Sequence, residues 1–279
     1  MAEEKRIFSW MNVSERTTKP RTAGINMVMA LHIAIEGMNM LEDLAGWAGD
    51  YIDYYKVGND MTIRPRQTIL RRLAFMKEHG IEPYAQGGVT GKAVKQGCID
   101  ACLDELVELK IGAVEASRIV LTMPQMLECI KKGKDRGLTV FAEVGKKYIG
   151  WEGGPKTHMS ADDVIEEMQT LLNAGAFKVI YEFMETVSLL KEEKGLEKLM
   201  HVMNTVGKDN VMLEVPVNAV GTWDEMSRYA ALFIDHFGPN VNLGNISVDH
   251  VMGVESLRHN FSAISAVGKR YSPQSRGGW

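Results

Sequence analysis

The stretch LTVFAEVGKKY, residues 138–148, guides the interpretation of the rest of the chain. It begins with a short, mostly apolar run, Leu138–Ala142, of the kind that forms a strand buried on both faces of a parallel sheet. It ends in Glu143-Val-Gly-Lys146-Lys147, so a carboxylate and an ammonium group stand where the strand should stop. Such an ending is typical of a barrel active site. The alternative is that Lys146 and Lys147 are solvated loop lysines and that Glu143 pairs with one of them.

The composition excludes several classes of protein. The chain has 279 residues, of which 45% are hydrophobic, so it can bury a large core. Its net charge is −4, and Lys and Arg are spread along the chain instead of forming a basic patch, so we expect no nucleic-acid partner. No apolar run approaches the roughly 20 residues of a membrane span. We therefore expect no membrane partner either.

The cysteines and the N-terminal residues indicate the cellular location of the protein. Cys98 and Cys102 lie four residues apart in an expected helix with no second pair nearby, which argues against a zinc site. Three cysteines suit a reduced interior. The charged first 21 residues lack the apolar segment of a signal peptide. We expect a cytoplasmic protein.

Short apolar strands alternate with amphipathic helices along the chain. The expected strands are Gly24–Ala30, Tyr51–Val57, Glu82–Gln86, Ala113–Ser117, Leu138–Ala142, Phe177–Glu182, Asn210–Val215 and Asn240–Asn245. The expected helices are Leu31–Trp47, Arg66–His79, Lys95–Leu109, Met123–Arg136, 160–174, Thr186–Val206 with a break near Gly195, Thr222–Phe237 and Val248–Phe261.

Eight such units predict an α/β protein with a (β/α)8 TIM barrel. A doubly wound open sheet would usually carry a glycine-rich loop after its first strand, and Ala30-Leu-His-Ile33 has none. We expect one domain, 1–279, with an N-terminal arm (1–23) and a polar C-terminal tail (262–279).

In a barrel, residues at the carboxyl ends of the strands converge on one mouth. The residues at these ends are Lys56, Gln86, Glu115, Ser117, Glu143, Lys146, Glu182, Glu214, Asn242 and Asn245. Buried carboxylates must pair with cations or a metal, or become neutral. We interpret the set as a site that holds an anionic substrate and moves a proton. Alternatively, some of these residues face outward or form structural ion pairs.

Three further features are candidates with open alternatives. Gly87-Gly88 and the run Asn240–Asn245 could bring backbone N–H groups close to an oxyanion, although most Gly-Gly pairs are simple turns. His32 follows the first strand, where a general base or ligand could lie, but a hydrogen-bonded structural histidine is the more common case.

Several motifs occur together in a recognisable order. They are Lys19-Pro-Arg21, Tyr51–Lys56, Gly87-Gly88, Val114–Ser117, Glu143–Lys147, Gly238–Ile246 and Glu255–Arg258. In this order and spacing the chain resembles the phosphosulfolactate synthase family over roughly residues 17–262. The resemblance implies a (β/α)8 barrel that adds sulfite to phosphoenolpyruvate, a small anionic substrate, on the route to coenzyme M. It also implies Mg²⁺ and a homo-oligomer.

The resemblance assigns roles to residues of this chain. By analogy Lys146 is the general acid, and Glu143 and Lys56 complete the catalytic set. Glu143, Glu182 and Glu214 are candidate metal ligands. The candidate substrate-binding residues are Arg21, Gly87, Gly88, Glu115, Ser117, Arg118, Asn242, Gly244 and Asn245.

The chain departs from the family pattern at loop positions that contact ligand. The family's Asp-Lys-Gly after strand one is Ala30-Leu-His32 here, its Ser-Asp-Gly after strand four is Ser117-Arg-Ile119, and its Arg-Glu-Ser after strand six is Met184-Glu-Thr186. These changes indicate a retained scaffold with an altered substrate. Two alternatives follow: a diverged member that acts on another acid through an enolate, and a non-catalytic relative of the plant heat-stress type.

Overall fold

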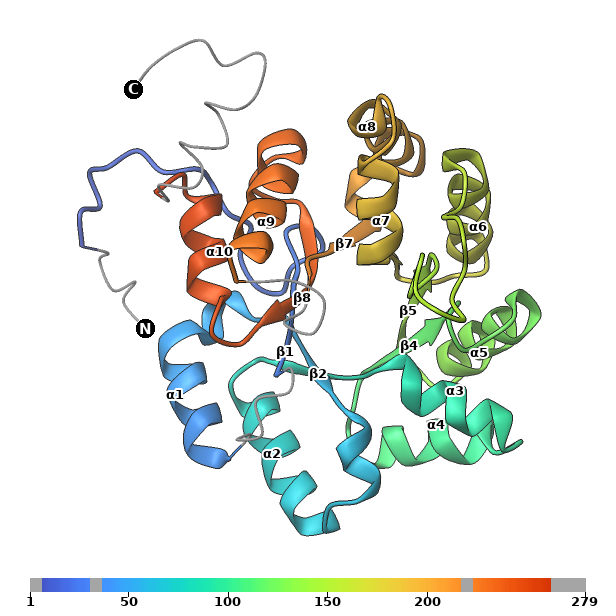
Figure 1. Cartoon of the computed structure of the whole chain (residues 1–279). Coiled ribbons are helices and arrows are strands. Elements are labelled where there is room, and N and C mark those ends of the chain that lie inside the picture. Colours follow the sequence, from blue (N-terminus) through green and yellow to red (C-terminus); the bar gives the residue numbers. More distant parts are fainter. Residues whose placement is uncertain (1–6, 31–36, 217–222, 262–279) are drawn as a thin grey trace.

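The computed structural model describes residues 7–30, 37–216 and 223–261. It contains a closed, all-parallel barrel in which each strand pairs with the next and β8 pairs with β1, and helices surround it (Figure 1). The strands are β1 Asn26–Met29, β2 Tyr54–Val57, β3 Glu82–Ala85, β4 Ala113–Ser117, β5 Thr139–Val144, β6 Lys178–Tyr181, β7 Val211–Glu214 and β8 Asn242–Ser247. The predicted (β/α)8 barrel is confirmed.

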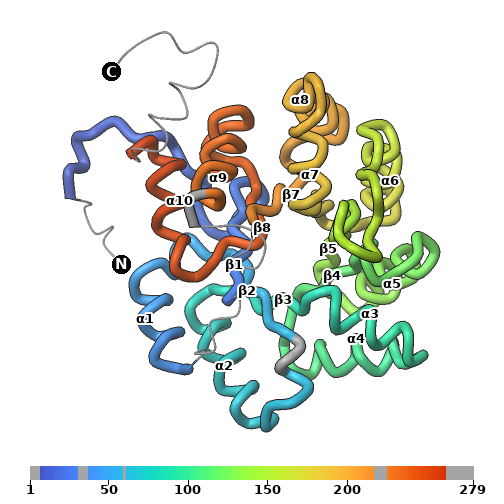
Figure 2. The backbone as a smooth tube through the Cα atoms, viewed as in Figure 1, coloured from blue at the N-terminus to red at the C-terminus, as the bar shows by residue number. Residues whose placement is uncertain are grey.

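The helices lie outside the barrel, as the tube in Figure 2 shows. They are α1 Met38–Ala48, α2 Arg66–Glu78, α3 Gly87–Lys95, α4 Ile99–Glu108, α5 Met123–Asp135, α6 Ala161–Asn173, α7 Phe183–Leu190, α8 Gly195–Val206, α9 Trp223–Phe237 and α10 Val251–Arg258. Ser160 begins α6, because its hydroxyl accepts the N–H of Asp163 at 3.1 Å. The predicted break near Gly195 is confirmed, since α7 and α8 are separate helices. None of the described helices is long and apolar enough to cross a bilayer.

Three local features differ from the interpretation of the sequence. The alternative that Gly87-Gly88 is a simple turn is wrong, because the pair forms the first turn of α3. The helix expected at Lys95–Leu109 is α4, which begins only at Ile99, and α3 is an additional helix before it. The eighth strand begins two residues later than expected and contains a bulge, because Asn26 and Val28 of β1 face Leu243 and Ile246 of β8. His32 and the expected tail at 262–279 lie outside the described residues.

The barrel interior is divided into an apolar middle and a polar upper layer. Ile25, Met27, Tyr84, Ala113, Phe141, Ile180 and Met212 form one buried cluster inside the barrel. Phe141 contacts the ring of Tyr84 edge to face, with 5.2 Å between ring centroids. Because side chains alternate along a strand, residues two positions further along β4, β5 and β7 share the upper layer, and these are Glu115, Glu143 and Glu214.

The amino-terminal ends of the strands carry a buried network of charged side chains and one amide, which we call the floor network: Arg16, Arg21, Asn26, Asp53, Glu255 and Arg258. Arg16 and Arg21 belong to the expected N-terminal arm. Arg16 pairs with Glu255 of α10 at 2.9 Å, and Arg21 pairs with Asp53 before β2 at 3.0 Å. The network therefore fixes the arm to the end of the barrel opposite the carboxyl ends of the strands.

Candidate active site

Seven of the sequence-predicted site residues meet at the carboxyl ends of the strands. We call this group the mouth: Lys56, Glu115, Ser117, Glu143, Glu182, Glu214 and Asn245, all of them buried. Each lies within two residues of the carboxyl end of its strand, and Asn245 is brought inward by the bulge in β8. Asn245 has a φ of +57°, a conformation that asparagine adopts more readily than most residues.

Lys56 is the best-connected cation of the mouth. Its Nζ lies 3.2 Å from Glu115 Oε2 and 3.7 Å from Glu214 Oε1, and it donates to Asn245 Oδ1 at 3.1 Å. Burial alone would lower the pKa of Lys56, but the charges of Glu115, Glu214 and Glu143 raise it above its ordinary value. Lys56 is therefore an ammonium group held in one position.

Glu115 is fixed from two sides. Besides Lys56, the hydroxyl of Tyr84 donates to Glu115 Oε2 at 2.5 Å. Burial favours the neutral acid, but the Lys56 and Lys147 charges and the Tyr84 hydrogen bond hold the pKa of Glu115 below its ordinary value. Tyr84 was not among the predicted site residues, although its position next to last in β3 places it in the same interior as Glu115.

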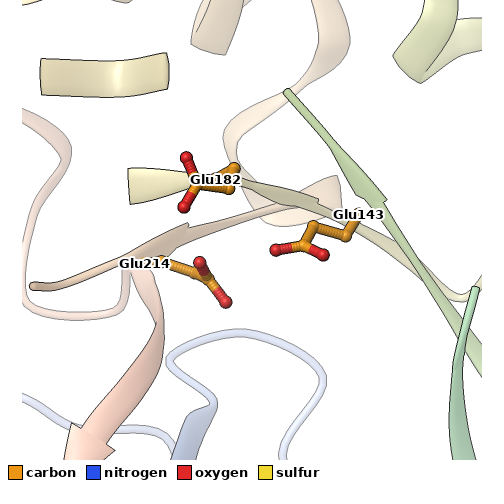
Figure 3. Close-up of side chains that lie close together, drawn as sticks. All are labelled: Glu143, Glu182 and Glu214. Atoms are coloured by element: carbon orange, nitrogen blue, oxygen red, sulfur yellow. The ribbon is translucent and has the colours of Figure 1, made fainter. Parts of the chain in front are cut away.

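Glu143, Glu182 and Glu214 converge from three adjacent parts of the barrel, as Figure 3 shows. Each offers one carboxylate oxygen, and these three atoms lie within 4.8 Å of one another. Ser117 donates its hydroxyl to Glu143 Oε2, and Glu182 accepts the N–H of Glu185 at 3.0 Å as the cap of α7. Neither oxygen of Glu214 accepts a hydrogen bond within the described part of the chain.

This crowding shifts the protonation of two of the three carboxyls. Burial, followed by the charge of Glu214, raises the pKa of Glu182 to about 9. Burial also raises the pKa of Glu143 to about 7, with Lys147 opposing the shift and Glu115 adding to it. Carboxylates held this close without enough cations are typical of a functional site.

Lys147, not Lys146, is the second ammonium of the mouth. Lys147 Nζ lies 3.0 Å from Glu143 Oε1, whereas Lys146 Nζ donates to the carbonyl of Thr157 at 3.1 Å. Burial would lower the pKa of Lys147, but Glu143, Glu214, Glu115 and Glu182 raise it well above its ordinary value. The placement of Lys146 in the mouth is thus corrected by one residue.

Two other predicted residues lie at the floor. Arg21 donates to Asp53 Oδ1 and to the carbonyl of Asp50. Asn242 begins β8, where it accepts the N–H of Ile25 and donates to the carbonyls of Asp209 and Val211. Both side chains are used in structural hydrogen bonds at the far end of the barrel. Their prediction as substrate-binding residues is not supported by their positions.

The remaining predicted residues lie near the mouth in different roles. Arg118 follows β4 but turns outward, and its Nε donates to Glu167 of α6 at 3.2 Å. Gly87 lies against the mouth, because a Cβ there would be 2.6 Å from Glu115 Oε1, whereas Gly88 is exposed. Gly244 forms the wall behind Glu214, with 3.4 Å between the position of its absent Cβ and Glu214 Cγ. The two buried glycines leave room for these carboxylates.

A family model for (2R)-phospho-3-sulfolactate synthase matches residues 14–263. The chain belongs to this family. Phosphosulfolactate synthase from Methanocaldococcus jannaschii is 32% identical over 226 residues, which cover 78% of this chain and 85% of that protein. Family membership makes the chain a lyase of the phosphosulfolactate synthase type, and it confirms the resemblance found in the sequence.

The chain is also similar to a plant protein in sequence and to another enzyme in structure. Protein HEAT-STRESS-ASSOCIATED 32 from Arabidopsis thaliana is 24% identical over 284 residues, covering 92% of this chain and 93% of that protein. Among solved structures, orotidine 5'-phosphate decarboxylase from Pyrococcus horikoshii superposes with a TM-score of 0.52 at 10% identity, over 83% of this chain and 98% of that chain. This structural likeness shows the barrel fold alone.

Proposed function

We propose that this member of the family adds sulfite to phosphoenolpyruvate, forming a C–S bond as in the biosynthesis of coenzyme M. The single observation that carries the proposal is the mouth itself. It combines three buried carboxylates within 4.8 Å with two ammonium groups, in a chain that the family model matches almost from end to end. This donor set suits the stabilisation of an enolate-like anion beside a proton donor.

The carboxylates fit the Mg²⁺ that the family implies. Glu143, Glu182 and Glu214 offer hard oxygen donors, which Mg²⁺ prefers, and both oxygens of Glu214 lack hydrogen bonds within the described chain. When all are ionised, four carboxylates and two ammonium groups leave two negative charges in the mouth, which one divalent cation would neutralise. Bound Mg²⁺ would supply Lewis-acid stabilisation of the negative charge that develops on the substrate carboxylate.

The chain's own groups account for the remaining chemistry. The sulfur lone pair of sulfite forms a bond to C3 of phosphoenolpyruvate, and the electrons of the C2–C3 double bond move onto the carboxylate. Lys147 then gives its ammonium proton to C2 and regains a proton from solvent. Its raised pKa ensures that the proton is present at neutral pH. Lys56, held by Glu115 and Asn245, orients an anionic group of the substrate.

One observation favours a second candidate, a related unsaturated acid with less negative charge than phosphoenolpyruvate. Both ammonium groups of the mouth already face carboxylates, and Arg118, the guanidinium nearest to the end of β4, is paired with Glu167. The cations of the described mouth therefore offer little surplus positive charge to a phosphate group. An acrylate-type acid lacks the phosphate, so its binding would need less positive charge from the mouth.

The test is a direct assay. Purified protein is incubated with sulfite and either phosphoenolpyruvate or a phosphate-free unsaturated acid, with Mg²⁺ or with EDTA, and the sulfonate product is detected by mass spectrometry. We expect product from phosphoenolpyruvate that requires Mg²⁺. Product from only the phosphate-free acid would replace the first candidate with the second. Formation of neither product would exclude both.

Three expectations complete the proposal. The described cysteines are all free thiols, which is compatible with a cytoplasmic location. Homo-oligomerisation and the exclusive use of small anionic partners stay predictions. Sedimentation analysis of the purified chain would measure the oligomeric state.

A further inference from the structure

Two consecutive lysines follow β5, and they enter different surroundings. Lys147 Nζ lies 3.0 Å from Glu143 in the mouth, whereas Lys146 Nζ donates to Thr157 outside it. The two side chains are chemically identical. The backbone between Gly145 and Lys147 must therefore decide which of them faces the mouth, and the contacts that fix this backbone select the active lysine.

One buried carboxylate holds both ends of the loop between β5 and α6. Glu185 Oε2 accepts the backbone N–H of Lys146 at 2.7 Å, and Glu185 Oε1 accepts the backbone N–H of Met159. The side chain of Glu185 is 0% exposed. A carboxylate that accepts backbone N–H groups is a strong acceptor. The loop 146–159 is thus closed by a side chain that belongs to α7.

The chain leaving β5 lies directly against the first turn of α7. Gly145 has a φ of +124°, and a Cβ there would lie 2.8 Å from Glu185 Cβ and 2.9 Å from Glu182 Cβ. Only glycine satisfies both the backbone conformation and the space. His158 flanks the same carboxylate, with Nδ1 3.8 Å from Glu185 Oε1. Close packing at Gly145 and the hydrogen bond from the Lys146 N–H to Glu185 therefore fix the backbone before Lys147.

We propose that Glu185 is a positioning residue for Lys147: by holding the N–H of Lys146, it directs Lys147 into the mouth and Lys146 along the loop. The inference rests on the proposed function, in which Lys147 is the proton donor. Glu185 acts through the backbone of the loop. Its removal should change the orientation of Lys147 more than the charge of the mouth.

The first experiment does not depend on the reaction. Brief acetylation of lysine amines, read by fragment mass spectrometry, measures the labelling rates of Lys146 and Lys147 in the folded protein. In the wild type we expect slower labelling of Lys147, because its Nζ is paired with Glu143 inside the mouth, whereas Lys146 Nζ lies in an exposed contact with the Thr157 carbonyl. In Glu185→Ala the two rates should become similar. Glu185→Gln, which keeps the side-chain volume and one acceptor oxygen, should lie between.

Glu82→Gln is the matched control. Glu82 Oε1 also accepts a backbone N–H, that of Gly112 at 2.8 Å, but at the amino-terminal end of β3. We expect wild-type labelling of both lysines in this variant. A wild-type ratio in both Glu185 variants, or faster labelling of Lys147 than of Lys146 in the wild type, would overturn the inference.

The second experiment uses turnover with phosphoenolpyruvate and sulfite. We expect Glu185→Ala to lower kcat by about 100-fold with an unchanged KM, the loss typical of a misplaced catalytic group. In a Glu185→Ala/Lys147→Ala double variant, kcat should equal that of Lys147→Ala alone, because both changes remove the same contribution. If the losses of kcat of the two single variants multiply in the double variant, Glu185 has a separate structural role and the inference is refuted. A wild type inactive on phosphoenolpyruvate refutes the proposed reaction, while the labelling ratio still decides the role of Glu185.

Discussion

The floor and the mouth of this barrel both bury charged side chains, but they balance them differently. At the floor, three guanidinium groups face two carboxylates, and every carboxylate oxygen of Asp53 and Glu255 accepts a hydrogen bond. In the mouth, two ammonium groups face four carboxylates, and Glu214 accepts none within the described chain. The carboxylates of the floor are fully hydrogen-bonded, and those of the mouth are prepared for a ligand.

This difference separates stability from function. A buried ion pair with all its hydrogen bonds made holds its elements in one arrangement, and breaking it is costly. A cluster of like charges destabilises the metal-free fold but creates affinity for a cation and for developing charge. We therefore expect substitutions at the floor to change the free energy of unfolding and substitutions in the mouth to change turnover.

The largest effect should come from Lys147→Ala. Loss of a general acid typically costs about 10²–10⁴ in kcat, and we expect a value in this range for turnover of phosphoenolpyruvate with sulfite. Lys146→Ala is the control, because the Lys146 Nζ donates to the Thr157 carbonyl outside the mouth. Steady-state kinetics of both variants would show which lysine is the general acid. A larger loss of kcat in Lys146→Ala would restore the assignment made from sequence.

At the floor, Arg258→Ala should cause the greatest loss of stability. Its guanidinium is buried and donates to the carbonyls of Pro239 and Val241 and to Asn26 Oδ1. Breaking such a network should lower the free energy of unfolding by about 3–5 kcal/mol. Urea unfolding would measure the change.

A surface arginine provides the comparison for that measurement. Arg136 pairs with Asp100 and Asp104, both of which are more than half exposed at the side chain. Arg136→Ala should change the free energy of unfolding very little, because exposed ion pairs contribute little to stability. Equal losses in the two variants would show that the floor network is no more important to the fold than a surface pair.

In contrast to the floor variants, Glu214→Gln should raise the free energy of unfolding of the metal-free protein. Removing one of the crowded charges should stabilise the metal-free protein by about 0.5–2 kcal/mol while abolishing turnover. It should also abolish the rise in Tm that Mg²⁺ gives the wild type, because the cation then loses a ligand. Thermal unfolding with EDTA and with Mg²⁺ measures both effects. A variant that unfolds at a lower temperature without metal would show that Glu214 has a structural partner.

Much of the fold could be predicted because it depends on local pattern. The alternation of apolar strands and amphipathic helices is a repeated signal, and the strand Ala113–Ser117 has the bounds expected from sequence. The carboxylates of the mouth could be found for the same reason. Glu115, Glu143 and Glu214 lie within two residues of the carboxyl ends of their strands, where parallel strands converge.

The errors in the predicted site arose where a small shift of a strand, or a contact with a residue distant in sequence, decides which side chain faces the mouth. β8 starts two residues later than expected, which moves Asn242 to the floor and leaves Asn245 in the mouth through a bulge. After β5, Gly145 in the left-handed region changes which side chain points inward, so Lys147 replaces Lys146. The sequence shows the glycine but not the carboxylate of Glu185, 39 residues further along than Lys146, that fixes the backbone.

Arg21 and Arg118 show a related limit. Each stands near a motif that suggested ligand binding, but each is paired with a residue far away in sequence. Arg21 is paired with Asp53 across the floor, and Arg118 with Glu167 on α6. A charged side chain at either end of a barrel has several possible partners within its reach. Tertiary packing, which single-residue patterns do not encode, selects among them.

The last expected effect is a pH dependence of stability that has opposite signs at the two ends. Burial opposes ionisation of Glu255, but the Arg16 hydrogen bond and the Arg258 charge hold its pKa below the ordinary value. Its contribution is therefore present above the pKa of an unfolded glutamate and is lost as pH falls through the folded pKa. For Glu143 and Glu182 the folded pKa values are raised, to about 7 and about 9. The folded mouth thus binds protons that the unfolded chain has released.

The free energy of unfolding of the metal-free protein should therefore decline as pH rises from about 5 through about 7 and towards 9, because the folded state must give up these protons. Each proton released corresponds to about 1.4 kcal/mol per pH unit. Mg²⁺ should flatten the decline, since the cation replaces the protons. Glu182→Gln, which keeps the acceptor oxygen that caps α7 and removes the charge, should flatten it in EDTA. Urea unfolding at pH 5, 7 and 9 tests this; an undiminished decline in Glu182→Gln would place its origin outside the mouth.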